Sequence, residues 1–188
     1  MAVDADLFRR VLGSFPAGVT IVTAVEGDGT PKGLTSNAVT SVSASPPLLL
    51  VCVDKSSNTL SAIEHSQAFV VNFLAEGAEE LALRFASKDP DKFAGLPWRA
   101  STLARGAPIL ADHVVAFAEC HVTQRIEAGD HYVFIAQIEH GVVGDGVPLM
   151  YFRHHFAPWP QQSDDDGRQG MVGLVRRRAF AGAGSRPR

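Results

Sequence analysis

The stretch that decides the fold class is VTIVTAVEGDGTPKGLTSNAVTSVSASPPLLLVCVD, residues 19–54. Residues 19–25, 33–44 and 46–54 are rich in β-branched and other apolar side chains, which are typical of strands. The Gly, Asp and Pro residues at 27–33 separate the first two segments and are typical of a hairpin turn. The stretch therefore predicts antiparallel strands joined by short turns.

The turn segment GDGTPKG at 27–33 also has the look of a dinucleotide-binding glycine loop. That loop needs the spacing GxGxxG between a strand and a helix of a parallel βαβ unit. Here the spacing is GxGxxxG and strand-like sequence follows. We interpret the segment as a hairpin turn, so a nicotinamide nucleotide must bind without a Rossmann loop.

The rest of the chain continues the mainly β pattern. Strands are predicted at residues 67–75, 113–128, 131–143 and 147–153, the last two joined by a second GDG turn at 144–146. Many non-local strands with short turns predict a closed or nearly closed antiparallel barrel.

Few helices are expected. An amphipathic opening helix, capped by Asp4 or Asp6, ends near Gly13. A later helix carries Leu81 and Phe85 one turn apart. The polar residues that follow it, at 86–98, are punctuated by Pro and Gly and are typical of a loop over a site.

Composition favours one globular domain, over residues 1–157, with a small-molecule partner. Of 188 residues, 46% are hydrophobic and 20% charged, and the net charge of -3 gives no field that attracts nucleic acid or an anionic membrane. The N-terminus does not read as a signal peptide, and no run approaches the roughly 18 apolar residues of a membrane span. Residues 158–188 are predicted to be a disordered tail, whose basic cluster either is solvated or contacts a partner or nucleic acid.

The two cysteines, Cys52 and Cys120, lie inside apolar runs. They have no metal-ligand spacing with each other or with histidines, so we interpret them as free buried thiols and expect no metal. Free thiols favour a reducing, cytoplasmic compartment.

Two polar segments are candidate binding sites. A dense set of hydroxyl and amide groups begins with Thr35, Ser36 and Asn37. These groups can form hydrogen bonds with the polar edge of a flat heterocycle, although such groups are also common on solvent-facing strands. Residues 54–59, DKSSNT, place hydroxyls and a lysine before a short helix, where they can bind a phosphate or simply cap the helix. Arg84 can supply a second phosphate contact or be merely exposed.

His131 follows Gly129 and Asp130 and begins a strongly apolar strand. Its imidazole is expected at the end of the barrel, where it can donate to a ligand or relay a proton near neutral pH. A histidine in an ordinary turn is an equally good interpretation.

The chain closely resembles the flavin reductase-like family, the short-chain reductases that accompany flavin-dependent aromatic and polyketide monooxygenases. The resemblance covers residues 5–157. The motifs that carry it are FPAGVTIVTA at 15–24, GLTSNAVTSVSASPPLLLVCVDKSSNTLSAI at 33–63, FVVNFL at 69–74, LALRFASKDPDKFAG at 81–95, AGDHYVFIAQIEHG at 128–141 and PLMYFR at 148–153.

The resemblance implies a mainly β, FMN-binding split β-barrel of Greek-key type with a few short helices, assembled as a homodimer. Residues 35–38 would line the isoalloxazine ring, 52–54 would back it, Ser56, Ser57 and Thr59 would hold the ribityl phosphate, and 84–86 would close that side. The residues assigned to cofactor binding are Lys32, Gly33, Thr35, Ser36, Asn37, Ala38, Ser41, Cys52, Val53, Asp54, Ser56, Ser57, Thr59, Arg84, Phe85, Ala86, His131, Tyr151 and Arg153, of which the last three would face the nicotinamide nucleotide.

The activity that the resemblance implies is NAD(P)H-dependent reduction of free FMN or FAD. Hydride passes from the nicotinamide C4 to flavin N5, His131 orients the nicotinamide or assists protonation, and diffusible reduced flavin serves a partner monooxygenase. NADH is favoured over NADPH, because no arginine cluster near the GDH motif offers a partner to a 2'-phosphate. Two alternatives stay open: a split-barrel flavoprotein oxidase of the pyridoxamine-phosphate-oxidase type, and a non-catalytic flavin-binding electron carrier.

Overall fold

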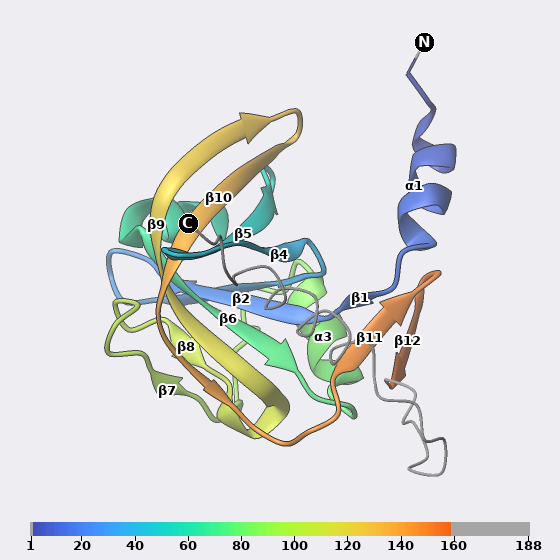
Figure 1. Cartoon of the computed structure of the whole chain (residues 1–188). Helices are drawn as coiled ribbons and strands as arrows, with labels where there is room; N and C mark the ends of the chain where they lie inside the picture. Colours follow the sequence, from blue (N-terminus) through green and yellow to red (C-terminus); the bar gives the residue numbers. More distant parts are fainter. Residues whose placement is uncertain (1, 159–188) are drawn as a thin grey trace, which may run out of the picture.

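The computed structural model describes residues 2–158, and its centre is one seven-stranded sheet (Figure 1). All of the ladders in this sheet are antiparallel. The predicted tail at 158–188 lies, after Pro158, outside the described residues. The strands, in order across the sheet, are β3 (Pro31–Ser36), β2 (Thr20–Val25), β6 (Ala68–Leu74), β9 (Val114–Ala128), β10 (His131–Val143), β5 (Pro47–Asp54) and β4 (Val39–Ala44).

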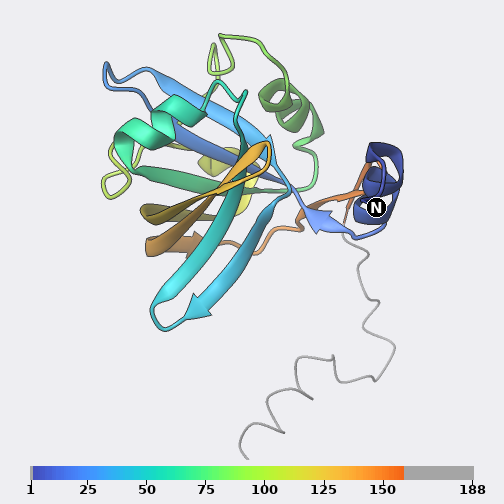
Figure 2. The ribbon, with the colours of Figure 1, turned by 90° about the horizontal axis from the view of Figure 1, so that it is seen from above.

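The prediction of a mainly β fold is confirmed, and the hairpin turn predicted at 27–33 lies between β2 and β3, with residues 31–33 already in β3. Of the expected closed or nearly closed barrel, the closed form is not found among the described strands, because β3 and β4 form the two edges of the sheet and do not pair with each other. Between them, Ser36 Oγ accepts a hydrogen bond from Ala38 N at 3.1 Å, and Ala38 O accepts one from Cys52 N. This corner turns the chain from one edge to the other, and the two strands then diverge (Figure 2).

Smaller sheets flank the main one. The GDG turn at 144–146 leads from β10 to β11, but β11 pairs with other strands rather than folding back on β10. These elements are β1 (Ala17–Gly18), β11 (Leu149–Phe152) and β12 (His155–Pro158) in one sheet, β7 (Arg99–Ala100) and β8 (Pro108–Ile109) in another, and the 3-10 helix η1 (Ala111–His113).

Two helices cover the sheet and fix the site between them. Helix α2 (Leu60–Ser66) buries Ala62 and Ile63 in the main core, and α3 (Glu79–Ala86) buries Phe85 in a second core. The end of α3 lies very close to β3, since a Cβ added at Gly33 would be 2.6 Å from Phe85 Cε1. Glycine at this position therefore permits the close approach of helix and strand.

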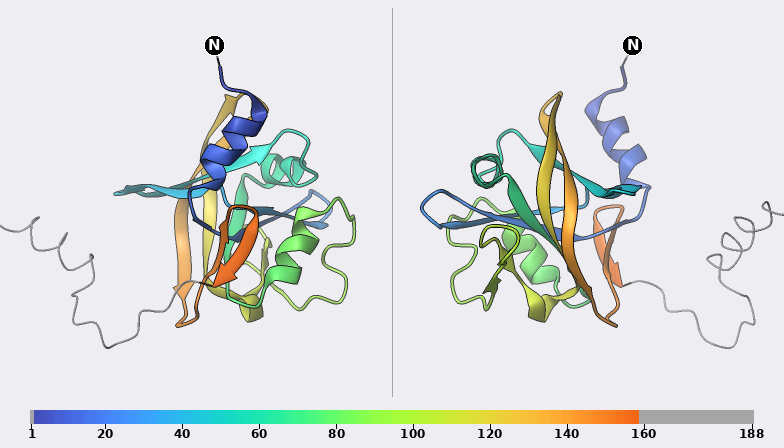
Figure 3. Two further views of the ribbon diagram at one scale, coloured as in Figure 1. Left: turned by 90° about the vertical axis from the view of Figure 1, so that its right-hand side faces the viewer. Right: turned by 60° about the vertical axis from the view of Figure 1, so that its left-hand side comes forward.

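Helix α1 (Ala5–Gly13) begins as predicted at Asp4, whose Oδ1 accepts a hydrogen bond from Leu7 N at 2.7 Å. The helix stands away from the sheet and buries no residue (Figures 1 and 3). Leu7, Phe8 and Val11 are 38%, 55% and 59% exposed. The helix is amphipathic as predicted, but its apolar face is not covered by other described residues.

A buried carboxylate fixes the loop that follows β7. Glu119 on β9 is 3% exposed and accepts hydrogen bonds from Ser101 Oγ and, at 3.3 Å, from Leu103 N. His140 Nδ1 on β10 lies 2.8 Å from the other carboxylate oxygen. Burial opposes ionisation of Glu119, but the hydrogen bonds outweigh it and hold its pKa below the ordinary value.

Both cysteines are free, as predicted. Cys120 is buried, and desolvation raises its pKa to about 12. Within residues 2–158, no group of three or more His, Cys, Asp and Glu side chains is placed to hold a metal ion. The same part of the chain contains no helix that is long and apolar enough to cross a membrane.

Candidate functional site

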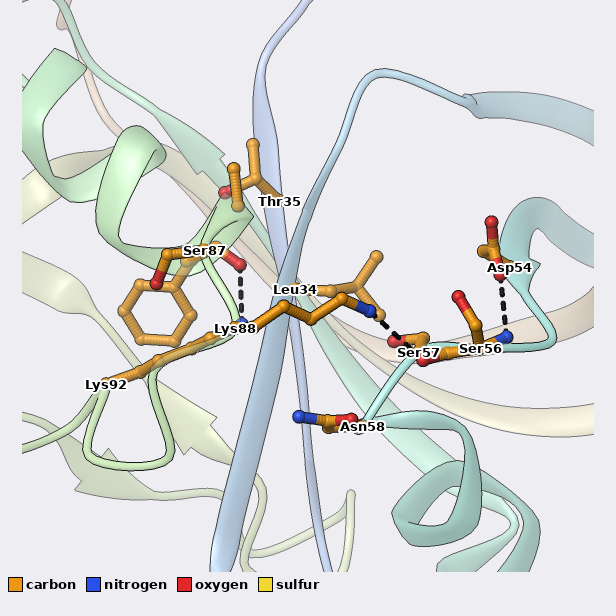
Figure 4. Close-up of a pocket in the computed structure, with 11 residues that line it drawn as sticks. Leu34, Thr35, Asp54, Ser56, Ser57, Asn58, Ser87, Lys88 and Lys92 are labelled. Atoms are coloured by element: carbon orange, nitrogen blue, oxygen red, sulfur yellow. Dashed lines mark hydrogen bonds between the residues drawn. The ribbon is translucent and has the colours of Figure 1, made fainter.

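A cavity of about 160 Å³, here called the main cavity, lies between β3, the loop from β5 to α2, and the end of α3 (Figure 4). Apolar walls meet hydroxyls, an amide and two ammonium groups there. The residues that line it are Leu34, Thr35, Asp54, Ser56, Ser57, Asn58, Phe85, Ala86, Ser87, Lys88 and Lys92.

The loop before α2 is shaped by its own polar groups. Asp54 Oδ1 accepts a hydrogen bond from Ser56 N at 2.6 Å, and these hydrogen bonds from Ser56 hold the pKa of Asp54 below its ordinary value. Ser57 Oγ accepts from Thr59 N at 3.2 Å. The cap position of α2 is Thr59, without a side-chain hydrogen bond, so the prediction that Ser56 or Ser57 caps the helix is wrong.

One polar side chain on this loop is available to a ligand. The amide of Asn58 makes no hydrogen bond with another described residue and lines the main cavity, whereas the Ser56 hydroxyl lies beside the Asp54 carboxylate.

The cations of the site come from the loop after α3. Lys88 extends across the cavity, and its Nζ donates to Ser56 O at 3.2 Å (Figure 4). Lys92 Nζ donates to Gly33 O at 3.1 Å and Phe85 O at 2.7 Å, and burial lowers the pKa of this lysine. An ammonium has three N–H groups, so each lysine keeps at least one free.

Sequence reasoning missed both lysines. It did predict that residues 86–98 form a loop over a site, and the two lysines stand in that loop. The available signal was therefore a pair of cations, four residues apart, within a segment already expected to cover a ligand.

Arg84 does not line the main cavity, although the sequence suggested a phosphate contact there. Its guanidinium donates to Asp91 O at 3.2 Å and Ala94 O at 2.5 Å, and the residue lines a different hollow with Leu96 and His113. Arg84 thus supports the loop that carries the lysines, while Phe85 and Ala86 do line the cavity as predicted.

Of the hydroxyl and amide set around residues 35–41, only Thr35 lines the main cavity. Its Oγ1 donates to Ala82 O at 2.6 Å and so joins β3 to α3. Ser36, Asn37 and Ala38 form the corner between β3 and β4, and Ser41 is exposed on β4.

Of the three residues at the end of β5, residues 52–54, only Asp54 lines the main cavity. Val53 is fully buried in the main core. Cys52, on the opposite face of the strand, is half-buried, and burial raises the pKa of its thiol.

His131 begins β10 directly opposite Asp54, at the end of the sheet nearest the main cavity. Its Nδ1 lies 2.7 Å from Asp130 Oδ1, and this hydrogen bond lowers the pKa of the carboxyl. The imidazole side chain is 41% exposed. His131 does not line the main or the second cavity, and its role stays a prediction.

Tyr151 and Arg153 do not line the main cavity. Tyr151 packs on Phe156, with ring centroids 5.2 Å apart. Arg153 stands in the turn between β11 and β12 and lines a separate hollow with Arg9 and Arg10.

A second cavity of about 100 Å³ adjoins the main one. The two share Asn58 and Lys92. Lys32, Gly33 and Thr59, which the sequence assigned to cofactor binding, lie here. The full lining is Pro31, Lys32, Gly33, Asn58, Thr59, Asp89, Pro90, Lys92 and Phe93.

Comparison with known proteins identifies the family of this chain. Residues 12–160 match the family model described as flavin reductase like domain. The chain belongs to this family. The resemblance stated from the sequence motifs is thereby confirmed.

The relatives of this flavin reductase family member cover most of its length. A flavin reductase (NADH) of Kitasatospora aureofaciens is 42% identical over 164 residues, 86% of this chain and 85% of that protein. HsaB of Rhodococcus jostii, the reductase subunit of a flavin-dependent monooxygenase, is 38% identical over 84% of this chain and 85% of that one.

Solved structures of flavin reductases have a similar fold. The NADH:FAD oxidoreductase SgcE6 of Streptomyces globisporus, in complex with NAD and FAD fragments, has a TM-score of 0.79 and 33% sequence identity. The similarity covers 87% of this chain and 99% of that one. The flavin reductase PheA2 in its native state has a TM-score of 0.76 and 30% identity, over 85% of this chain and all of that one.

Proposed function

We propose that this chain uses NADH or NADPH to reduce free FMN or FAD and supplies the reduced flavin to a partner monooxygenase. The observation that carries the proposal is the main cavity, which is lined by two lysines, the hydroxyls and amide of residues 56–58, Thr35 and Asp54. His131 does not line it but pairs with Asp54 across the neighbouring strands. The donor set fits a flavin phosphate, because ammonium and hydroxyl groups are the ordinary partners of phosphate oxygens.

Lys88 and Lys92 would hold the phosphate of the flavin, with Ser56, Ser57 and Asn58 on the opposite side. Lys88 now donates to Ser56 O across the cavity, so this bond would break or be shared when a phosphate enters. The isoalloxazine ring would lie toward Thr35, Asp54 and the corner at residues 36–38.

When bound, the flavin supplies the acceptor of a hydride, at N5, from C4 of the nicotinamide. His131 would orient the nicotinamide or hold the proton that accompanies reduction. Asp130 lies against Nδ1 and so leaves Nε2 for the ligand. No nucleophile is needed, which agrees with the raised pKa of both cysteine thiols.

A homodimeric split barrel is part of the proposal. The exposed apolar face of α1, formed by Leu7, Phe8, Val11 and Leu12, is the surface that a second copy would cover. Apolar side chains at this spacing share one side of a helix, and contiguous apolar surface commonly marks an interface.

NADH is the proposed donor. Three arginines, Arg9, Arg10 and Arg153, line a separate hollow and do not line the main cavity. They therefore offer no partner there to the 2'-phosphate of NADPH. The cytoplasmic location stays a prediction from the free cysteines. The absence of nucleic acid and membrane partners stays a prediction from the net charge and from the lack of a long apolar run.

The test is NADH oxidation by the purified protein, followed by absorbance, with and without added FMN, FAD or riboflavin. Protein-dependent oxidation that scales with added flavin supports the proposal. Tight flavin binding without oxidation of NADH or NADPH would instead identify an electron carrier, and oxidation of another substrate without a nicotinamide nucleotide would identify an oxidase.

A further inference from the structure

The structure assigns the second cavity to the second phosphate of FAD, so that Lys32 makes the enzyme prefer FAD to FMN. This inference rests on the proposed function, and it goes further by naming the flavin and the residue that selects it. FMN ends at one phosphate, whereas FAD continues from that phosphate through a second one to adenosine.

Continuity of the two cavities is the first argument. Asn58 and Lys92 line both, so the two spaces meet at the side chains proposed to hold the first phosphate. Thr35 and Asp54 line only the main cavity, and Lys32 lines only the second. A ligand whose ring lies near Thr35 and whose phosphate lies near Asn58 continues into the second cavity.

Charge is the second argument. Lys32 and Lys92 bring two ammonium groups to the second cavity, and Asp89 is its single carboxylate. One oxygen of Asp89 already accepts a hydrogen bond from Asp91 N at 2.8 Å. The described cations therefore outnumber the anion, and Lys32 makes no hydrogen bond with another described residue.

Size and wall chemistry are the third argument. A cavity of about 100 Å³ is well above the roughly 10–15 Å³ that one water molecule needs, so it has room for a small polar group such as a phosphate. Pro31, Pro90 and Phe93 give the apolar walls that a sugar face can contact. Phe93 is fixed edge-to-face against Phe85, at 5.0 Å between centroids, and against Trp98 at 6.1 Å.

Three methionine variants separate the two cavities. Lys32→Met alters only the second cavity and Lys88→Met only the main one, and Arg125→Met is the control, on an exposed cation paired with Glu64 outside both cavities. Dissociation constants of FMN and FAD are measured by quenching of flavin fluorescence, and KM values of both flavins and of NADH by steady-state kinetics. The wild type should bind FAD more tightly than FMN.

The expected result is a selective loss. Lys32→Met should weaken FAD about tenfold and FMN less than about twofold, because one charge-assisted hydrogen bond is lost for FAD alone. Lys88→Met should weaken the binding of both flavins to a similar degree, and Arg125→Met should change neither.

Equal effects of Lys32→Met on FMN and FAD, or no effect on either, would overturn the assignment. An increase in KM for NADH alone would also overturn it, because the cavity would then hold the diphosphate of the nicotinamide nucleotide. Failure of the proposed function would look different: no flavin would support NADH oxidation by the wild type, whatever the binding constants.

Discussion

At the scale of single residues, Lys88 makes the sharpest prediction about flavin recognition. Riboflavin lacks the phosphate that Lys88 is proposed to bind. Lys88→Met should therefore raise the KM for FMN about tenfold and leave the KM for riboflavin nearly unchanged. Steady-state kinetics with the two flavins measure this difference. A parallel increase for both flavins would show that Lys88 supports the loop rather than the phosphate.

His131 is predicted to act on turnover and not on flavin affinity. His131→Ala should lower kcat about 10- to 100-fold, because an orienting or proton-holding imidazole is lost. The fluorescence dissociation constant for flavin should stay within about twofold. His155→Ala, an exposed histidine on β12, is the control. Loss of flavin binding in His131→Ala would assign the residue to the flavin site instead.

Glu119 is predicted to make stability depend on pH. Its pKa is lower in the folded chain than the ordinary value of 4.5, so its stabilisation is complete above that value and is lost as the pH falls below it. Glu119→Gln should lower the free energy of unfolding by about 2 kcal/mol at neutral pH and by less in acid. Urea unfolding at several pH values measures both. A difference between variant and wild type that is constant with pH would contradict the ionic role.

At the scale of elements, the strands were predictable and their closure was not. The segments that became β2, β3, β5, β6, β9 and β10 carry strand-like sequence bounded by Gly, Pro and Asp, and short-range patterns specify these features. Whether the edge strands β3 and β4 pair with each other depends on the twist and coiling of the whole sheet, and the hydrophobic periodicity of single segments does not specify this.

The site was predictable to the same extent. Asp54, Ser56 and Ser57, which the sequence offered either to a phosphate or to helix capping, line the main cavity. The sequence could not place Arg84, because its position on the helix shows only that its side chain points away from the buried face. The carbonyls that hold it belong to a loop whose path depends on tertiary packing.

The approach of α3 to β3 gives a prediction about an element contact. Gly33→Ala would place a methyl group 2.6 Å from Phe85 Cε1, so the helix or the ring must move. The free energy of unfolding should fall by about 1–3 kcal/mol, and flavin affinity should fall with it because Phe85 lines the main cavity. Urea unfolding and fluorescence titration measure the two effects. Gly29→Ala, with no atom within 4 Å but a φ of +86°, tests backbone strain without a packing clash.

At the scale of the whole molecule, α1 is predicted to join two copies of the chain. Val11→Glu puts a charge on the exposed apolar face of a helix that buries none of its own residues, so the fold of the monomer should persist. Sedimentation velocity should show a dimer for the wild type and a monomer for the variant. A wild-type monomer would refute the proposed dimer.

The position of the lysines has a consequence for how such an enzyme can change. Lys88 and Lys92 stand on the segment after α3, which connects elements without belonging to the sheet. Residues 86–91 are exposed, whereas Lys92 donates to Gly33 O on β3 and Phe93 and Leu96 pack against the second core. Ligand preference can therefore vary with little effect on folding stability only in the first part of the segment, so a library confined to residues 86–91 should yield altered cofactor choice among mostly folded proteins.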